Sequence, residues 1–321
     1  MTKVFITDHV KDPYIEKSIL GDEVSINRDT NAQVLLVWRE NITEEYLAQF
    51  PHVKAIIRYG VGFDRIDLDY ATSRGVYVCN IPDYCVDEVA DTTIAMMLNI
   101  TRAISRLDFR ARQNTEIWQR NAVNEIQRTS ELTLGFIGTG RIGTNVLLKA
   151  QALKFQTIFY DPYLSSGWER VLNSSRVESL DELLNVADIV SVHTPLNLTT
   201  KNMVNKNFIS KMKAGSIFIN TSRGRLIEDI DIFYDFLKSD HLFGVALDAI
   251  PQEPPLEGKL ISAWKNNEPW LDGRLIINPH TAYVSQQAVY EMHLKAAQNA
   301  LRVLEGKIPI NIVNSKTLEA V

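Results

Sequence analysis

The chain has few cysteines and no long apolar run. Its two cysteines, Cys79 and Cys85, are too few for a disulfide framework, and neither stands in a spacing with Cys or His that would bind zinc. We therefore expect a reducing, cytoplasmic location and no metal site. No apolar run reaches the roughly 18 residues of a membrane span, and the first apolar residues meet Asp8 too early for a signal peptide, so neither is expected.

The chain also lacks a large excess of basic over acidic residues, or of acidic over basic residues. The 34 Lys and Arg residues face 39 Asp and Glu residues, which gives a formal net charge of -5, and no long run carries one sign. This balance lacks the basic surface that binds nucleic acid or an anionic membrane, so a small-molecule partner is favoured. With 45% hydrophobic and 23% charged residues over 321 positions, the composition is that of a globular protein of about two domains.

Short apolar runs alternate with amphipathic segments along most of the chain. A first series spans residues 4–79, and a second spans 132–278. Two long segments without Gly or Pro, 87–106 and 286–305, read as helices that bracket the second series. The alternation predicts an α/β protein with two doubly wound parallel sheets, Rossmann-like or flavodoxin-like, the second inserted within the first. We expect a substrate domain of residues 1–106 and 284–321 and a nucleotide domain of residues 107–283.

A glycine-rich motif opens the second series. Gly138, Gly140 and Gly143 match the dinucleotide-binding pattern, which follows an apolar run here and opens a helix. Gly138 suits the tight turn, Gly140 lets a pyrophosphate approach the backbone, and Gly143 allows close helix packing. The start of the helix, at Arg141 and Ile142, would supply N–H groups to the phosphates.

An acidic residue follows at the end of the next predicted strand. Asp161 stands where the pattern places a carboxylate on the adenosine ribose hydroxyls. Because this carboxylate would repel a 2′-phosphate, NAD is favoured over NADP. A neighbouring arginine could reverse that preference, but the residues that follow are Tyr163, Leu164 and Ser165.

Three polar side chains stand beside predicted strand ends after the motif. Arg223, Glu253 and His280 can converge because the carboxyl ends of parallel strands line one crevice. Reduction of a 2-oxo acid needs a cation for the carboxylate, which suits Arg223, and an acid for the carbonyl oxygen, which suits His280. Glu253 would hold the imidazole and favour its protonated form. Each residue alone also has a structural alternative: Arg223 as a surface ion pair, His280 as a core histidine and Glu253 as a solvated loop charge.

These residues belong to longer stretches that resemble the D-isomer-specific 2-hydroxyacid dehydrogenases. The resemblance runs from Arg58 to Pro309 and is carried by residues 59–67, 138–143, 187–196, 212–224 and 279–280. It implies that Arg223, Glu253 and His280 take the catalytic roles and that the backbone at Val61 and Gly62 receives the substrate carboxylate. It further implies contacts with the cofactor from four residues: His193, Pro195, Thr221 and Asp248. Members are typically dimers through the nucleotide domain, which would give Trp118 a partner to pack on.

Within that family the chain is similar to the branch of the C-terminal-binding proteins, corepressors that keep the dehydrogenase fold. Residues 58–65 and 160–170 carry this likeness, and Tyr283 stands where that branch has an aromatic residue shortly after the histidine. The main prediction is an NAD-dependent oxidoreductase that interconverts a D-2-hydroxy acid and its 2-oxo acid. The alternative is an NAD(H)-responsive binding module. A formate or phosphite dehydrogenase is disfavoured, since Val61 replaces the extra cation that such an anion needs.

Two arginines and one loop bear on the substrate. Arg39 and Arg58 both follow predicted strands of the first domain, so both can face the crevice and bind a second polar or anionic group of the substrate. The alternative is that they form rim salt bridges with nearby Asp and Glu side chains. The loop of residues 254–275 is longer than the family pattern needs, and its sequence fits either a surface loop packed on the sheet edge or a functional role, as a substrate-side lid or a contact with a partner subunit.

Overall fold

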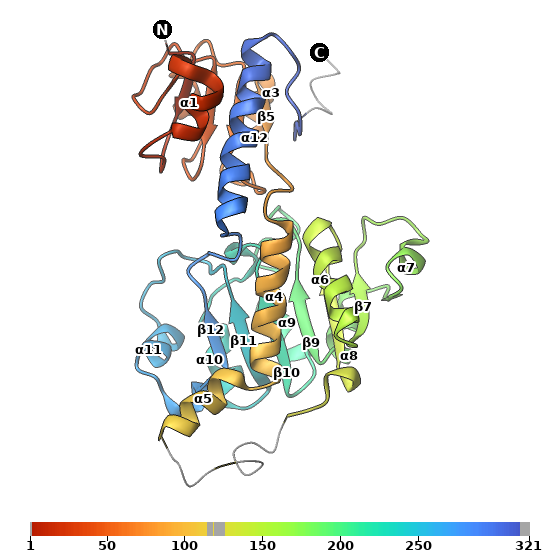
Figure 1. Ribbon diagram of the computed structural model, residues 1–321. Helices are drawn as coiled ribbons and strands as arrows, with labels where there is room; N and C mark the ends of the chain where they lie inside the picture. Colours follow the sequence, from red (N-terminus) through yellow and green to blue (C-terminus); the bar gives the residue numbers. More distant parts are fainter. Residues whose placement is uncertain (1, 114–117, 119–125, 315–321) are drawn as a thin grey trace. The chain divides into compact units, whose positions relative to one another are not determined.

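The computed structural model describes residues 2–113, 118 and 126–314 (Figure 1). Its internal contacts divide the chain into two compact units, residues 1–85 with 284–321 and residues 86–283. The second unit is therefore inserted in the chain of the first. Both units contain one parallel sheet covered by helices, which confirms the predicted fold class.

The first unit is built on a five-stranded sheet in the order β2-β1-β3-β4-β5. All pairs are parallel, and the ends of the strands are in register, with Ile6 beside Leu36, Leu36 beside Ile57 and Ile57 beside Cys79. The strands are β1 (Val4–Ile6), β2 (Val24–Ser25), β3 (Val34–Val37), β4 (Ala55–Arg58) and β5 (Tyr77–Cys79). The order reverses between β1 and β3, which makes this the flavodoxin-like topology.

Helices cover both faces of this sheet. On one face α2 (Glu44–Leu47) and α3 (Leu68–Ser73) bury Leu47 and Ala71 with Leu35 and Ile56 of the strands. On the other face α1 (Tyr14–Leu20) packs along α12 (Gln286–Leu304), which in turn contacts β3 and β4. A short 3₁₀ helix, η1 (Gly21–Glu23), follows α1. Strands buried on both faces explain why their sequences are continuous apolar runs.

The second unit is built on a seven-stranded parallel sheet in the order β12-β11-β10-β9-β6-β7-β8. The order reverses between β6 and β9, the position at which doubly wound sheets bind ligands. The strands are β6 (Thr133–Ile137), β7 (Gln156–Tyr160), β8 (Ser175–Arg176), β9 (Ile189–Val192), β10 (Ser216–Asn220), β11 (Leu242–Leu247) and β12 (Leu275–Ile277).

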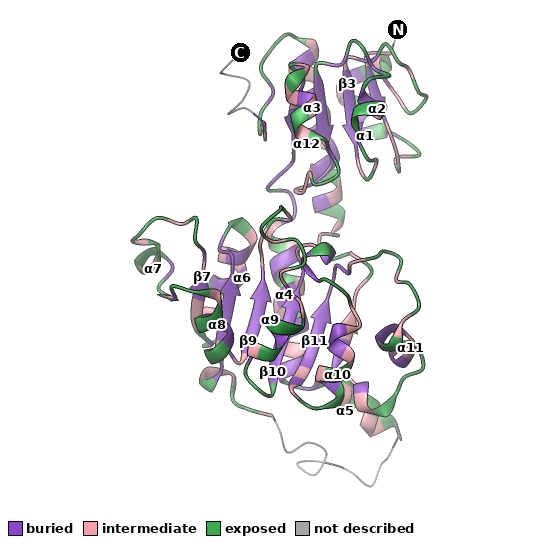
Figure 2. Ribbon diagram, turned by 180° about the vertical axis from the view of Figure 1, so that it is seen from behind, coloured by how far each residue is buried: buried purple, intermediate pink, exposed green. Residues whose placement is uncertain are grey.

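Side chains alternate between two cores on the faces of this sheet. Ile217 and Ile219 of β10 join the core under α4 (Val86–Thr101) and α6 (Arg141–Ala152), whereas Phe218 joins the core on the opposite face. The helices of that opposite face are α8 (Leu180–Val186), α9 (Lys206–Lys211), α10 (Ile232–Lys238) and α11 (Lys259–Lys265). The remaining short helices are α7 (Trp168–Val171), η3 (Thr129–Glu131), η4 (Gly224–Leu226) and η5 (Pro269–Leu271). Figure 2 shows the strands of each sheet buried and the outer sides of the helices exposed.

The helix expected over residues 87–106 ends earlier in the structure. Helix α4 stops at Thr101, Ala103 turns the chain at a positive φ of 53°, and α5 (Ile104–Gln113) follows. Asn99 fixes this break, because its side chain accepts a hydrogen bond from the Ser105 N–H and donates one to the Ser105 hydroxyl. The single long helix was therefore wrong, since a local side-chain contact ends it.

Helix α4 also moves the domain boundary. Its buried residues Met96, Met97 and Ile100 lie in the same core as Phe136 and Ile219, so the second unit begins at Val86 rather than after residue 106. The other boundary lies between Tyr283 and Val284. There α12 begins at Gln286, after Ser285, whose hydroxyl accepts from the Ala288 N–H, and it ends at Leu304, close to the predicted range of 286–305.

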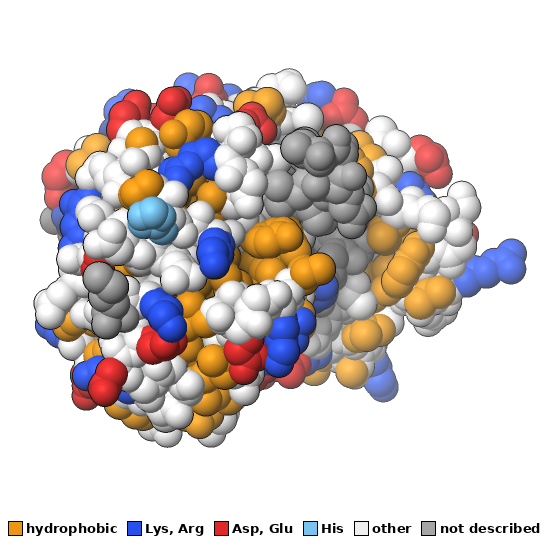
Figure 3. Space-filling view, turned by 90° about the horizontal axis from the view of Figure 1, so that it is seen from above, with side chains coloured by type: hydrophobic (Ala, Val, Ile, Leu, Met, Phe, Trp, Pro, Cys, Tyr) orange, Lys and Arg blue, Asp and Glu red, His pale blue; other side chains and the backbone are white. Residues whose placement is uncertain are grey.

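The visible surface carries both signs of charge. On the face shown in Figure 3, Lys and Arg side chains are interspersed with Asp and Glu side chains. Among the described helices, none combines the length and the apolar character that a membrane crossing requires. Residues 114–117 and 119–125 lie outside the described residues, while Trp118 between them is exposed, and its packing on a partner subunit stays a prediction.

Candidate functional site

The glycine-rich loop joins β6 to α6, and its three glycines have different surroundings. Gly138 has a φ of 88°, and a Cβ there would lie 2.9 Å from the His193 carbonyl oxygen. A Cβ on Gly143 would clash with the Gly138 carbonyl oxygen. Gly140, directly before Arg141 and Ile142 of the first helical turn, has nothing within 4 Å of its Cβ position. Two glycines thus allow close packing, and the third leaves space above the helix N-terminus, which fits a dinucleotide phosphate.

Asp161 lies directly after β7 and joins this strand end to the glycine-rich loop. Its Oδ2 accepts hydrogen bonds from the Thr139 N–H at 2.9 Å and from the Thr139 hydroxyl at 3.2 Å. Its Oδ1 accepts from the Tyr163 N–H at 3.0 Å. Asp161 is 9% exposed, and the ends of β6 and β7 lie side by side here, because the Gly138 N–H donates to the Tyr160 carbonyl oxygen.

An arginine that the sequence did not reveal lies near Asp161. Arg176, from β8, donates to the Asp161 carbonyl oxygen and to the Leu164 carbonyl oxygen, each at 3.0 Å. Strand β8 pairs with β7, which brings a residue distant in sequence beside the strand end. No local motif marks this contact, because it depends on the pairing of an edge strand only two residues long.

A strip of residues after β9 lies against the glycine-rich loop. The His193 Nε2 is 2.8 Å from the Ser191 hydroxyl, whereas the His193 Nδ1 and the Thr194 hydroxyl are buried and have no hydrogen-bond partner among the described residues. Burial lowers the pKa of His193 to about 4, so the imidazole is neutral at pH 7. Pro195 follows, and its carbonyl oxygen accepts from the Thr200 hydroxyl. Buried polar atoms without partners fit a site that a ligand completes.

The loop after β10 carries Arg223 and is organised by Asn220. The Asn220 side chain accepts from the Ser222 N–H at 3.1 Å and donates to the Arg223 carbonyl oxygen at 2.9 Å. The Thr221 hydroxyl lies 2.8 Å from that of Thr93 on α4. Thr93 was not predicted, because a buried threonine on a helix looks the same in sequence whether it contacts a loop or only the core.

The loops after β11 and β12 bring Glu253 and His280 into contact. The His280 Nδ1 lies 2.8 Å and 3.0 Å from the two Glu253 carboxylate oxygens, and both side chains are about one-third exposed, at 31% and 29%. His280 has a positive φ of 56°, and its N–H donates to the Asp248 carbonyl oxygen at 3.0 Å. The structure thus holds Nδ1 by a carboxylate and orients the other ring nitrogen, Nε2, away from it.

Asp248 fixes the backbone that carries His280. Its Oδ1 accepts from the N–H groups of Thr281 and Ala282, each at 3.0 Å. Burial raises the pKa of Asp248, although these two hydrogen bonds and the nearby His280 oppose the rise. Tyr283 lies close by, with its ring 6.4 Å from the His280 ring in an edge-on arrangement.

Arg223, Asp248 and His280 leave three adjacent strands at the same level. Asn220 pairs with Leu247, and Leu247 pairs with Ile277, so β10, β11 and β12 end together. The structure therefore places the predicted catalytic and cofactor residues of the second unit at the carboxyl edge of one sheet. It shows a direct contact for Glu253 with His280, and for Arg223 a hydrogen bond to the Ser222 carbonyl oxygen.

The predicted substrate residues of the first unit lie in the loop after β4. Arg58 folds back so that its Nη1 donates to the Tyr59 carbonyl oxygen. The carbonyl oxygens of Gly60 and Val61 accept from the Ile81 N–H and the Asn80 side chain. The N–H groups of Val61 and Gly62 have no acceptor among the described residues. Two adjacent unengaged N–H groups can bind a carboxylate.

Arg39 follows β3 and is exposed. Its N–H donates to Asp8 Oδ2 at 2.5 Å, and its carbonyl oxygen accepts from Arg65 at 3.3 Å. Within the described part of the chain its guanidinium forms no ion pair with Glu40 or Glu44. A role for Arg39 in substrate binding stays a prediction.

The loop of residues 254–275 packs on the second unit. Trp264 and Trp270 contact its core, and the ring of Trp270 lies 5.2 Å from that of Tyr234. Asp231 accepts hydrogen bonds from the N–H groups of Lys259 and Leu260 at the start of α11. These contacts favour the surface-loop interpretation over a lid.

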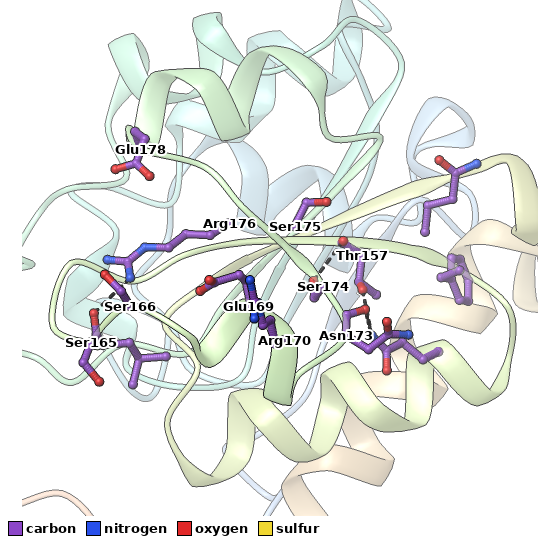
Figure 4. Close-up of a pocket in the computed structure, with 14 residues that line it drawn as sticks. Thr157, Ser165, Ser166, Glu169, Arg170, Asn173, Ser174, Ser175, Arg176 and Glu178 are labelled. Atoms are coloured by element: carbon purple, nitrogen blue, oxygen red, sulfur yellow. Dashed lines mark hydrogen bonds between the residues drawn. The ribbon is translucent and has the colours of Figure 1, made fainter.

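A large open cavity lies elsewhere on the second unit, at the outer edge of its sheet (Figure 4). It has a volume of about 1120 Å³ and is lined mostly by polar side chains of β7, α7 and β8, among them Ser165, Glu169 and Arg176. The Arg176 guanidinium is engaged by the two backbone carbonyl oxygens described above. The cavity contains none of the predicted catalytic residues.

Comparisons with known proteins agree on one family. Residues 94–282 match the model described as "D-isomer specific 2-hydroxyacid dehydrogenase, NAD binding domain". The chain is 32% identical to a glyoxylate reductase of Thermofilum pendens, over 91% of this chain and 84% of that protein. It is 30% identical to C-terminal-binding protein 1 of Caenorhabditis elegans, over 87% of this chain but only 38% of that protein.

A solved structure supports the same relation. The D-lactate dehydrogenase of Aquifex aeolicus, crystallised with NAD and lactic acid, is 27% identical and superposes with a TM-score of 0.81. The match covers 99% of this chain and 97% of that one. The likeness therefore includes both units of the chain.

The surroundings of the glycines predict opposite effects for two matched substitutions. Gly143→Ala should lower the free energy of unfolding by about 1–3 kcal/mol, because its Cβ would clash with backbone. Gly140→Ala should leave stability within about 1 kcal/mol of wild type, since its Cβ meets nothing, but should weaken NADH binding. Urea unfolding and NADH titration measure both effects. Equal stability of the two variants would contradict the packing described for the loop.

His193 predicts a pH-dependent loss of stability. Its pKa falls from 6.5 to about 4 on folding, so the unfolded chain binds a proton that the folded chain rejects as the pH drops through this window. Wild type should therefore lose on the order of 2–3 kcal/mol more than His193→Gln between pH 7 and pH 4. Urea unfolding without cofactor at several pH values measures this difference. Parallel curves for the two proteins would show that His193 titrates normally.

Proposed function

The chain belongs to the D-isomer-specific 2-hydroxyacid dehydrogenase family, and on this premise we propose that it interconverts a D-2-hydroxy acid and its 2-oxo acid with NAD(H). The observation that carries the proposal is the hydrogen bond between His280 and Glu253 on the sheet edge that also bears Arg223. An acid held by a carboxylate, beside a cation, is what reduction of a 2-oxo acid requires.

The cofactor is assigned to the glycine-rich edge of the second unit. The backbone of residues 138–143 would hold the pyrophosphate, and Asp161 would accept from the ribose hydroxyls. When bound, the nicotinamide would give or take the hydride. The other residues proposed to line the cofactor are His193, Pro195, Thr221 and Asp248.

His280 is proposed as the acid and base of the reaction. Its Nδ1 is held by Glu253, so Nε2 is the atom that donates a proton to the carbonyl oxygen during reduction and takes it back during oxidation. Glu253 keeps the ring oriented and stabilises its positive charge. Each reduction consumes one proton and one hydride, and each oxidation returns both.

The substrate carboxylate is assigned to Arg223 and to the N–H groups of Val61 and Gly62. Arginine suits this role because its planar fork binds a carboxylate through two parallel hydrogen bonds. The two N–H groups support the assignment because the chain leaves them without an acceptor among its described residues. Tyr283 is proposed to shape the space beside His280, while Arg39 and Arg58 are proposed to select the rest of the substrate.

A binding module that responds to NAD(H) is the second candidate. The likeness to C-terminal-binding protein 1 supports it. The two candidates differ in turnover. The purified chain, mixed with NADH and a panel of 2-oxo acids, should oxidise NADH with at least one of them, whereas NADH binding without turnover on any acid would favour the binding module.

A homodimer and a cytoplasmic location are proposed alongside the enzyme.

The first prediction for the enzyme is a preference for NADH over NADPH. Asp161 places a negative charge at the proposed ribose site, while the nearby Arg176 is engaged by backbone carbonyl oxygens, so repulsion of a 2′-phosphate should dominate. We expect kcat/KM to favour NADH by at least about 10-fold, and Asp161→Ser to reduce this ratio. Comparison of kcat/KM for both cofactors tests it. Equal use of NADPH by wild type would mean that Arg176 outweighs Asp161.

The second prediction concerns Glu253→Gln. The substitution keeps the shape of the side chain but replaces the carboxylate that contacts Nδ1 with an amide, which is a weaker hydrogen-bond acceptor. We expect kcat for reduction to fall by about 10-fold or more, because the ring is oriented less firmly, while KM for NADH and the melting temperature change little. Steady-state kinetics and thermal unfolding of both proteins measure these effects. An unchanged kcat would mean that Glu253 does not position the His280 ring.

A further inference from the structure

A buried polar cluster in the first unit has no part in the proposed chemistry. It consists of Glu16 on α1, Tyr59 directly after β4 and His293 on α12. The Tyr59 hydroxyl donates to Glu16 Oε1 at 2.5 Å, and the His293 Nδ1 donates to the same oxygen at 2.6 Å. Glu16 is 1% exposed, Tyr59 is fully buried and His293 is 9% exposed.

The cluster keeps a carboxylate charged in the protein interior. Burial alone would raise the pKa of Glu16, but the hydrogen bonds from His293 and Tyr59, together with the charge of His293, bring it below its usual value. Burial, and the carboxylate beside it, raise the pKa of Tyr59 well above its usual value, so the phenol remains a donor. Apolar residues of similar size would often stabilise a core as well as such a pair does. Stability of the core alone therefore does not explain why these three polar side chains are buried together.

Aromatic packing fixes the two rings that hold Glu16. The Tyr59 and His293 rings lie 4.9 Å apart, and Trp38 packs on both, at 5.8 Å and 5.4 Å. The backbone of Trp38 is fixed in turn, because its main-chain N–H donates to Asp8 Oδ1 at 2.9 Å. The phenol of Tyr59 thus has one orientation, set by contacts from α1, α12 and the loop after β3.

Because the Tyr59 side chain is fixed, the backbone of Tyr59 is fixed too, at the start of the loop of residues 60–62. Its N–H donates to the Val37 carbonyl oxygen at 2.7 Å, and its own carbonyl oxygen accepts from Arg58. The next residue, Gly60, has a φ of 123°, which turns the chain so that Val61 and Gly62 follow with their N–H groups unengaged among the described residues. The cluster is attached to the loop by the residue directly before this turn.

We propose that Glu16 and His293 are positioning residues that fix, through Tyr59, the loop of residues 60–62 in the conformation that binds the carboxylate of the 2-oxo acid. This inference rests on the proposed function, since it assigns that carboxylate to the N–H groups of Val61 and Gly62. Neither Glu16 nor His293 touches the substrate in this account. Their effect is to keep two backbone donors aligned before the substrate arrives.

Three substitutions test the inference by their effect on KM. Tyr59→Phe removes one oxygen, Glu16→Gln removes the charge, and His293→Leu removes the donor. Each should raise KM for the best 2-oxo acid by about 10-fold or more, while KM for NADH stays within about 2-fold and kcat falls less than KM rises. His293→Asn, whose amide can replace the Nδ1 donor, should restore most of the lost affinity relative to His293→Leu.

Asn299 provides the matched control. It is 1% exposed on the same helix α12, and its side chain bonds both the N–H and the carbonyl oxygen of Ile310, away from Tyr59. Asn299→Leu should lower the melting temperature but leave KM for the 2-oxo acid unchanged. A rise in KM as large as that of Tyr59→Phe would show that KM follows the stability of the unit, and would overturn the inference.

The remaining outcomes separate this inference from the proposed function. A wild-type chain that binds NADH but reduces no 2-oxo acid refutes both. An active wild type with unchanged KM in Tyr59→Phe refutes only the positioning role. If Glu16→Gln does not fold, Tyr59→Phe and the comparison of His293→Asn with His293→Leu still decide the question, because these changes leave the carboxylate in place.

Discussion

The proposed catalytic arrangement depends on the hydrogen bonds that Asp248 accepts from the backbone around His280. It accepts from two successive N–H groups, of Thr281 and Ala282, while the Asp248 carbonyl oxygen accepts from the His280 N–H. These three hydrogen bonds hold His280 in a left-handed backbone conformation that a residue other than glycine rarely adopts. The hydrogen bonds to Asp248, directly after β11, offset the energetic cost of that conformation. The imidazole reaches Glu253 because these bonds fix the backbone of His280.

The same device recurs where other strands end. Asp8 after β1 accepts from the N–H groups of Trp38 and Arg39 after β3, and Asp161 after β7 accepts from the Thr139 N–H after β6. In each case a short carboxylate crosses to the loop of a neighbouring or nearby strand. The physical reason is general: a loop that leaves a parallel sheet loses its ladder partners, and its N–H groups need acceptors. Each of these aspartates therefore fixes a loop at the carboxyl edge of its sheet, where doubly wound folds bind ligands.

Sequence predicts features that depend on neighbours along the chain. The glycine-rich loop, the alternation of strands and helices and the extent of α12 are of this kind, because each is set by residues within one or two turns. The pairing of Glu253 with His280 was predictable for a different reason, since an acid in this chemistry needs a partner and the family resemblance supplied the residues. The early end of α4 was missed because one side chain, Asn99, competes with helix continuation.

Contacts between distant segments were not predictable from local pattern. Arg176 reaches Asp161 only through the pairing of β8 with β7, and Glu16 meets His293 only because α1 and α12 pack together. Arg58 shows how such contacts change an interpretation. Its guanidinium lies where a Cβ of residue 60 would be, so a side chain at position 60 would displace Arg58, in addition to being strained by the positive φ. Arg58, which was predicted to bind the substrate, therefore also contacts the loop that follows it, and any effect of Arg58 on substrate choice must include its effect on the conformation of residues 59–62.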